Sequence, residues 1–226
     1  TTETVFLNLK SDSINTTYDS VYNIDQYEFT INQTKSGIYQ FFVGLNNYGG
    51  LLATYYRSEN FFNPVNLLSL NDQTSQYYTK IDNTVNISTM YEPALNNYPN
   101  NNISIKWEGF IKPKVSGIYK LSVKINGRTS IQLDEKQIIS YSNLNKLDGD
   151  TNNIYEIYLG SDKLYPINIT YTKGEGPNLF SLYWQNDLMM TPDIIPGDCL
   201  YYTQYSSQTP LQIDVVPQIT VPKNIK

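Results

Sequence analysis

Histidine is absent from this sequence, and cysteine occurs once, at Cys199. Without histidine the chain lacks the commonest general base and the commonest neutral metal ligand. The absence excludes Ser-His-Asp and Cys-His catalysis and any zinc site held by histidine. A single cysteine cannot form an internal disulfide, and with no histidine to activate it we expect Cys199 to be an inert, buried thiol.

Blocks of like charge and long apolar runs are absent as well. The formal net charge is −5, but there is no basic stripe to read nucleic acid and no basic amphipathic face to lie on a membrane. No apolar run approaches the ~18 residues that cross a bilayer. Alanine occurs only at Ala53 and Ala94, whereas there are 21 tyrosines. The abundance of Tyr, Ile, Thr, Val and Phe predicts an all-β chain.

Strict alternation of apolar and polar residues predicts strands over residues 119–125 and 165–171, each with one buried face. Trp107 and Trp184 occupy core-like positions in two further predicted strands, so we expect both to be buried. The residues predicted to face inward in the two alternating segments are Tyr119, Leu121, Val123, Ile125, Tyr165, Ile167, Ile169 and Tyr171.

Two tight turns are predicted after residue 125. Asn126-Gly127 stands between two alternating segments, and this dipeptide is the strongest short hairpin signal because a type I′ turn needs positive φ twice. A second turn is expected at Asp134-Glu135-Lys136.

Other segments complete the expected organisation. Residues 27–32 and 38–45 predict two strands ahead of the main body. A helical turn or two is the most that is expected near residues 62–70. Pro-containing residues 206–226 predict an extended edge strand or linker, or the opening of an immunoglobulin-like module. The longest polar segments, which predict surface loops, are 69–89, 91–102 and 142–153.

Five phrases occur in an order that resembles a PA14 domain: GGLLATYY (49–56), IKWEGFIKPKVSGIYKLSV (105–123), LYPINITY (164–171), LFSLYWQ (179–185) and DIIPGDCLYY (193–202). The resemblance implies a PA14-type β-sandwich with additional N-terminal strands. It divides the chain into N-terminal strands (1–48), the PA14-like domain (49–205) and the extended segment (206–226).

PA14 domains are known for binding and assembly, so the resemblance implies recognition and no enzyme activity. We expect an extracellular module that mediates cell adhesion by binding protein or glycan on another cell surface, within a larger protein anchored in the membrane outside these residues. The composition resembles social-amoeba surface recognition proteins. The alternative is a PA14 module of a bacterial toxin or surface enzyme, acting in oligomer assembly or carbohydrate targeting. A homo- or hetero-oligomer is compatible with both the adhesion function and the toxin or surface-enzyme function.

The calcium-dependent sugar-binding members of the PA14 family carry adjacent aspartates at the strand end that matches Asn126. Calcium is held by six to eight oxygens, usually including several carboxylates. The matching phrase here is Lys124-Ile125-Asn126-Gly127-Arg128, which has no acid and two cations. We therefore expect no metal and no cofactor at this turn. Asn126 and Arg128 remain candidates for direct ligand contact.

Contact residues are also expected in the polar loops, where tyrosines stand among small polar residues. The candidates are Tyr77, Tyr78, Tyr91 and Tyr98. Five Asn-x-Ser/Thr sequons predict a glycoprotein if the chain is secreted, at Asn15, Asn32, Asn86, Asn102 and Asn168. Because Asn168 alternates with inward-facing residues, its side chain is expected on a solvated strand face.

Overall fold

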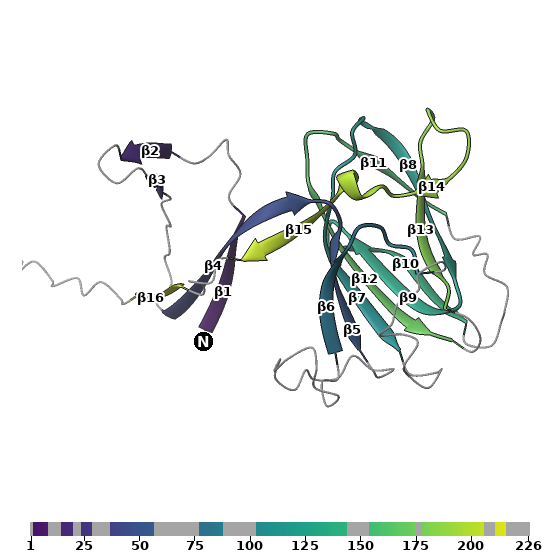
Figure 1. Cartoon of the computed structure of the whole chain (residues 1–226), viewed down its shortest axis with the longest axis horizontal. Coiled ribbons are helices and arrows are strands. Elements are labelled where there is room, and N and C mark those ends of the chain that lie inside the picture. The colour runs from purple at the N-terminus through teal and green to yellow at the C-terminus, as the bar shows by residue number, and fades with distance from the viewer. Residues whose placement is uncertain are drawn as a thin grey trace, which may run out of the picture. The chain divides into compact units, whose positions relative to one another are not determined.

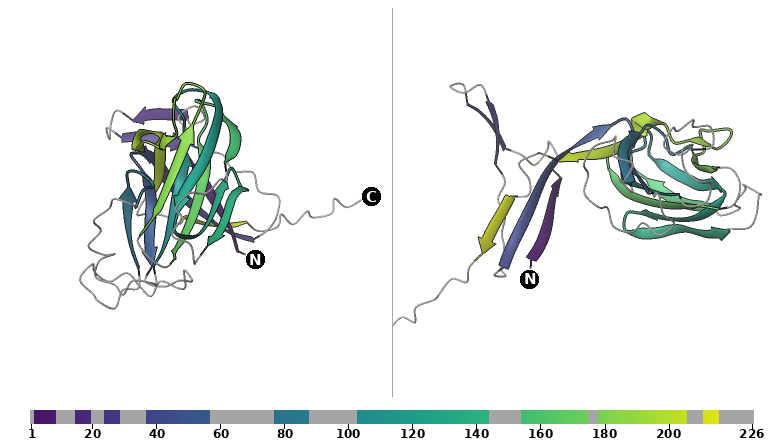
Figure 2. Two further views of the ribbon diagram at one scale, coloured as in Figure 1. Left: turned by 90° about the vertical axis from the view of Figure 1, so that its right-hand side faces the viewer. Right: turned by 60° about the horizontal axis from the view of Figure 1, so that its bottom comes forward.

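The structure, a computed structural model, describes residues 2–8, 15–19, 24–28, 37–56, 77–87, 103–143, 154–174, 178–205 and 211–215. Most of these residues are in β-strands (Figures 1 and 2), which confirms the all-β prediction. The described residues include no helix with the length and apolarity that a bilayer crossing requires. The chain divides into two compact units, Thr1–Asn46 with Thr203–Lys226, and Asn47–Tyr202.

The first unit combines strands from both ends of the chain. Strand β4 (Gly37–Tyr48) pairs in parallel with β1 (Thr2–Asn8) and antiparallel with β16 (Leu211–Val215). Strands β2 (Asn15–Asp19) and β3 (Ile24–Glu28) form a separate antiparallel pair. The strand predicted at residues 27–32 thus begins earlier, at Ile24, and its later residues lie outside the described part. The expected division at residues 48 and 205 stays a prediction.

The second unit is a sandwich of two antiparallel sheets (Figure 1). Within this unit the first sheet has the order β6-β5-β7-β12-β9-β10, and β15 pairs with the end of β7. Its strands are β5 (Leu51–Tyr56), β6 (Tyr77–Asp82), β7 (Ser104–Ile111), β9 (Gly127–Leu133), β10 (Lys136–Asn143), β12 (Tyr165–Lys173) and β15 (Leu200–Tyr205). The second sheet is β11 (Tyr155–Leu159), β8 (Gly117–Ile125), β13 (Phe180–Gln185) and β14 (Asp193–Ile194). A short 3-10 helix, η2 (Gly197–Cys199), precedes β15.

The alternating segments bury the predicted faces. All eight residues expected to face inward from β8 and β12 are at most 8% exposed. Trp107 and Trp184 are 0% and 5% exposed, which confirms both as core residues. The helical turns expected near residues 62–70 lie outside the described residues.

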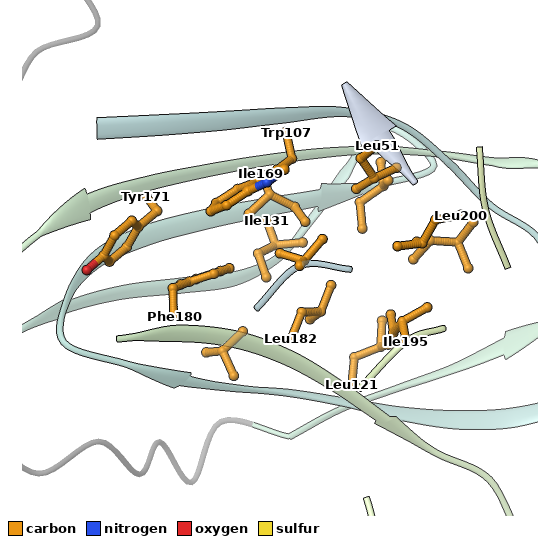
Figure 3. Close-up of a cluster of buried hydrophobic side chains, with 14 of the residues drawn as sticks. Leu51, Trp107, Leu121, Ile131, Ile169, Tyr171, Phe180, Leu182, Ile195 and Leu200 are labelled. Carbon is orange, nitrogen blue, oxygen red and sulfur yellow. The ribbon is translucent and has the colours of Figure 1, made fainter. Parts of the chain in front are cut away.

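An aromatic stack joins the two sheets within the core (Figure 3). The ring of Trp107 on β7 stacks on Phe180 of β13, with centroids 5.2 Å apart and planes inclined by 16°. Tyr171 on β12 contacts the same phenylalanine ring at 5.1 Å. Such pairs add to the free energy gained by burying the rings themselves.

A buried carboxylate accepts hydrogen bonds beside this stack. Asp82, at the end of β6, is 1% exposed. Its Oδ2 accepts hydrogen bonds from the Tyr55 hydroxyl at 2.6 Å and from the Trp107 indole Nε1 at 2.8 Å. Lys80 Nζ lies 3.1 Å from Oδ1 and is 28% exposed, so the pair reaches partway to solvent. The hydrogen bonds and the ion pair offset the cost of removing this charge from water.

The hairpin predicted at Asn126-Gly127 is wrong. Strand β8 pairs with β11 and β13 in one sheet, whereas β9 pairs with β10 and β12 in the other. The dipeptide is therefore a corner where the chain passes between sheets. Gly127 has φ of +134°, and a Cβ there would collide with the carbonyl oxygen of Thr172. Glycine is required by this close approach and not by a hairpin.

The two-residue hairpin occurs at the second predicted turn. Asp134 and Glu135 have φ of 51° and 66°, as the positive φ values of a type I′ turn require. They join β9 to β10, with Leu133 paired to Lys136. The turn at this position is thus confirmed.

Truncating Trp107 to alanine should lower the free energy of unfolding by ~3–5 kcal/mol, because the change removes a large buried ring and leaves a cavity beside Phe180. Chemical denaturation monitored by circular dichroism measures the loss. An unchanged midpoint would show that the ring is not part of the core.

Replacing Asp82 with alanine should cost ~3–5 kcal/mol, because it leaves the buried indole N–H and the Tyr55 hydroxyl without their acceptor and Lys80 without its partner. The matched control is Glu108→Ala, which removes an ion pair between Lys106 and a carboxylate that is 45% exposed. That control should change stability by at most ~1 kcal/mol. Equal effects of the two changes in urea unfolding would contradict the proposed importance of Asp82.

Candidate functional site

One end of the sandwich gathers most of the predicted contact positions. Residues paired across the first sheet at this end run in a single row: Tyr77, Tyr56, Ser104, Thr172, Arg128 and Ser142. In the second sheet Phe180 pairs with Ile125, next to Asn126, so the same end includes the corner between the sheets. We call this surface the Asn126 end.

The residues at which three long segments begin, Tyr56, Ile87 and Asn143, also lie at the Asn126 end. Segment 57–76 lies between the paired residues Tyr56 and Tyr77. Segment 88–102 follows Ile87, whose N–H donates to the carbonyl oxygen of Phe180, and precedes β7. Segment 144–153 follows β10, where Asn143 pairs with Gly127. All three are outside the described residues, and so are Tyr91 and Tyr98.

The predicted loop at residues 69–89 is partly wrong. Tyr77 and Tyr78 begin β6, where they pair with Tyr56 and Tyr55. The predicted loop at 142–153 likewise starts inside β10. Pairing with β5 makes residues 77–82 a strand. The polar composition of residues 69–89 gave no sign of this strand.

Asn126 is a structural residue at the centre of the corner. Its side chain is 2% exposed. Its N–H donates to the carbonyl oxygen of Leu179 at 2.8 Å, and its own carbonyl oxygen accepts from the Tyr171 hydroxyl at 2.9 Å and from the Gly174 N–H at 3.1 Å. Burial raises the pKa of Tyr171 well above its usual range, so this hydroxyl remains a donor. These bonds fix the corner in place.

Basic residues surround the corner. Arg128, partly exposed, lies between Thr172 and Ser142 in the paired row. Lys173 pairs with Gly127 and is 6% exposed, and its burial lowers the pKa of the ammonium group. The described residues contain no group of three or more His, Cys, Asp or Glu side chains placed to hold a metal ion.

The predicted sequons occupy different settings. Asn168 on β12 lies between Glu108 and Gln132 and is partly exposed. Asn86 accepts a hydrogen bond at 2.9 Å from the hydroxyl of Ser181, which is 0% exposed. Asn15 begins β2, while Asn32 and Asn102 are outside the described residues.

Cys199 is 2% exposed and lies in η2. Burial raises the pKa of its thiol to about 11, so the thiolate needed for nucleophilic attack is scarce at neutral pH. Sequence reasoning identified this thiol as inert. It did not find Asp82, because nothing in Lys80-Ile81-Asp82 marks the carboxylate as buried.

Comparison with known proteins identifies the family. The sequence model of the PA14 domain matches residues 47–198. The chain belongs to the PA14 domain family. No curated protein sequence matches it.

Solved structures share the PA14 fold. An anti-sigma factor domain-containing protein from Clostridium clariflavum is 23% identical with a TM-score of 0.53, over 69% of this chain and 47% of that protein. The epithelial adhesin 6 A domain of Candida glabrata is 14% identical with a TM-score of 0.50, over 72% and 91%. The C2-II component of the Clostridium botulinum C2 toxin is 20% identical with a TM-score of 0.51, over 72% and 29%. The chain spans about half the length of the anti-sigma factor domain proteins it matches.

The corner of this PA14 domain should not bind calcium, because Ile125, Asn126 and Arg128 provide no carboxylate there. Isothermal titration with millimolar Ca²⁺ should give no saturable heat. A stoichiometric signal that a chelator reverses, and that Asn126→Ala abolishes without unfolding the protein, would contradict this prediction.

Proposed function

We propose that this chain is an extracellular recognition module that binds protein or glycan on another cell surface through its Asn126 end, without calcium held at the corner. The observation that carries the proposal is that the described residues at which three long segments begin, Tyr56, Ile87 and Asn143, lie together at one end of the sandwich. Binding residues on β-scaffolds concentrate on loops that a rigid framework positions. The segments contain the tyrosines Tyr91 and Tyr98 among asparagine and proline.

Fold relatives support a glycan as one class of partner. The epithelial adhesin 6 A domain was solved in complex with Galb1-3GlcNAc. In the present chain the cations Arg128 and Lys173 stand at the corner, so a sugar would be held by direct hydrogen bonds and by stacking on tyrosine. The module acts by binding and not by catalysis, within a larger surface protein.

The C2-II toxin component supports a second candidate function. In that alternative the PA14 unit acts in oligomer assembly or in carbohydrate targeting of a bacterial toxin or surface enzyme. Assembly would bury the Asn126 end against another subunit, whereas recognition leaves it open to soluble ligand.

Glycan-array binding of the full chain, with and without chelator, tests the proposal. Tyr98→Ala and Tyr91→Ala should each weaken capture about tenfold, as the loss of a tyrosine anchor does, and chelator should have no effect. The matched control is Met190→Ala: Met190 is 100% exposed and follows β13 at the opposite end of the sandwich, so this change should leave binding intact.

Binding to glycans or to a cell surface that survives both tyrosine changes would remove the 91–102 segment from the interface. Absence of any glycan or cell-surface capture, together with stable oligomers that the same tyrosine changes dissociate, would favour the assembly function instead.

A further inference from the structure

The outer face of the first sheet carries a row of apolar side chains away from the Asn126 end. Phe110 on β7 pairs with Tyr201 on β15 and with Pro166 on β12, so the three side chains share one face. Phe110 and Tyr201 are partly exposed and Pro166 is exposed. The next pair along these strands, Ile111 with Leu200, is 0% exposed and faces the core. The Phe110 row is therefore turned towards solvent.

A glycosylation sequon, Asn168-Ile169-Thr170, stands on the same face. Asn168 on β12 pairs with Glu108 on β7, two residues before Phe110, so Asn168 and Phe110 are diagonal neighbours across the strand pair. Diagonal neighbours on one face of an antiparallel pair lie about 7–8 Å apart, within the reach of a large side chain. Ile167 and Ile169 are 3% and 0% exposed, so the partly exposed amide of Asn168 is on the solvent side.

The surroundings of Asn168 suit a sugar. On one side Glu108 forms an ion pair with Lys106 at 2.8 Å, and on the other side Gln132 offers an uncharged amide. Sugars stack their C–H faces on aromatic rings and hydrogen-bond through hydroxyl and acetamido groups. The loops that border the Phe110 row belong to the part of the chain that the structure describes, namely 112–116, 134–135, 160–164 and 195–199.

We propose that Asn168 carries an N-linked oligosaccharide and that its first N-acetylglucosamine packs on Phe110. The inference rests on the extracellular setting of the proposed function, because this modification belongs to secreted proteins. The donor is a lipid-linked oligosaccharide. A bond forms between Asn168 Nδ2 and C1 of the first sugar, and the bond from C1 to the diphosphate oxygen breaks. The lipid diphosphate leaves with the bonding electrons, and the amide loses one proton.

The position of Phe110 gives the glycan a direction. Thr172, in the row of paired residues at the Asn126 end, is four residues along β12 from Asn168, which corresponds to about 13 Å. Phe110 pairs with Pro166, on the opposite side of Asn168 from Thr172. A first sugar packed on Phe110 would therefore cover the outer face of the first sheet and leave the Asn126 end open to a ligand.

Mass spectrometry of the full chain, secreted from a glycosylating eukaryotic host, tests the modification. The peptide that contains Asn168 should carry hexose and N-acetylhexosamine, and Asn168→Gln should remove that mass. An unmodified Asn168 on the secreted chain overturns the inference. Ligand capture is scored on the Asn168→Gln chain, where it tests the proposed function separately from the glycan.

Thermal unfolding tests the packing of the first sugar. Asn168→Gln should lower the melting temperature of the glycosylated chain by about 2–4 °C, the effect of losing one aromatic contact in a domain of this size. The same change should have no effect on chain produced in bacteria, where Asn168 is unmodified. Trimming with an endoglycosidase that leaves the first sugar in place should preserve the melting temperature.

A double-mutant comparison identifies the partner of the sugar. In a Phe110→Ala background, Asn168→Gln should no longer change the melting temperature, because the ring on which the sugar packs is gone. The matched control is Tyr158→Ala, which removes a ring that is 64% exposed on the second sheet. In that background Asn168→Gln should keep its full effect. A glycan effect that persists without the Phe110 ring overturns the proposed packing.

Discussion

The contact between Trp107 and Asp82 connects three neighbouring strands of the first sheet to the second sheet. The indole ring stacks on Phe180 of the opposite sheet, and its N–H donates to a carboxylate at the end of β6. The same carboxylate accepts from Tyr55 on β5. Three strands of one sheet and one strand of the other are thus held by a single aromatic side chain and its acceptor. A buried indole N–H needs a hydrogen-bond acceptor. Because Asp82 at the end of β6 is that acceptor, the packing of Trp107 in the core and the position of β6 depend on each other.

The corner at Asn126 is the second constraint on the sandwich. Because β8 and β9 belong to different sheets, the chain must cross the sandwich within two residues, and the backbone of Gly127 packs against Thr172. Tyr171, Leu179 and Gly174 saturate the main chain of Asn126. The corner is therefore rigid. It carries lysine and arginine, and the described residues place no carboxylate at it, so under the proposed function a ligand would meet hydrogen-bond donors there in place of a coordinated cation.

The two ends and the flank of the sandwich have different surfaces. The Asn126 end contains the described residues at which three long segments begin. At the other end short loops are linked by polar contacts, such as the ion pair between Lys114 and Asp198 and the hydrogen bond between Ser116 and Ser161 at 3.1 Å. The flank at β11 has exposed apolar side chains and few polar ones.

Local sequence determined the strands whose two faces differ in polarity. Alternation at residues 119–125 and 165–171 specifies a buried face wherever the segment is placed, because side chains in a strand point alternately to opposite sides. The burial of Trp107 followed from the same alternation, whereas the inert character of Cys199 followed from the absence of histidine. The order of phrases along the chain was enough to identify the PA14 fold.

Tertiary structure alone decided the features that depend on long-range pairing. Asn126-Gly127 carries the same local signal for a hairpin and for a corner, and only the pairing of β8 with β13 and of β9 with β12 selects the corner. Tyr77 and Tyr78 belong to a strand because β5 offers them an open edge. Asp82 is buried because Tyr55 and Trp107, distant in sequence, supply its hydrogen bonds. A contact between residues far apart in the chain does not change the local periodicity of either segment. No local sequence pattern could therefore have indicated these contacts.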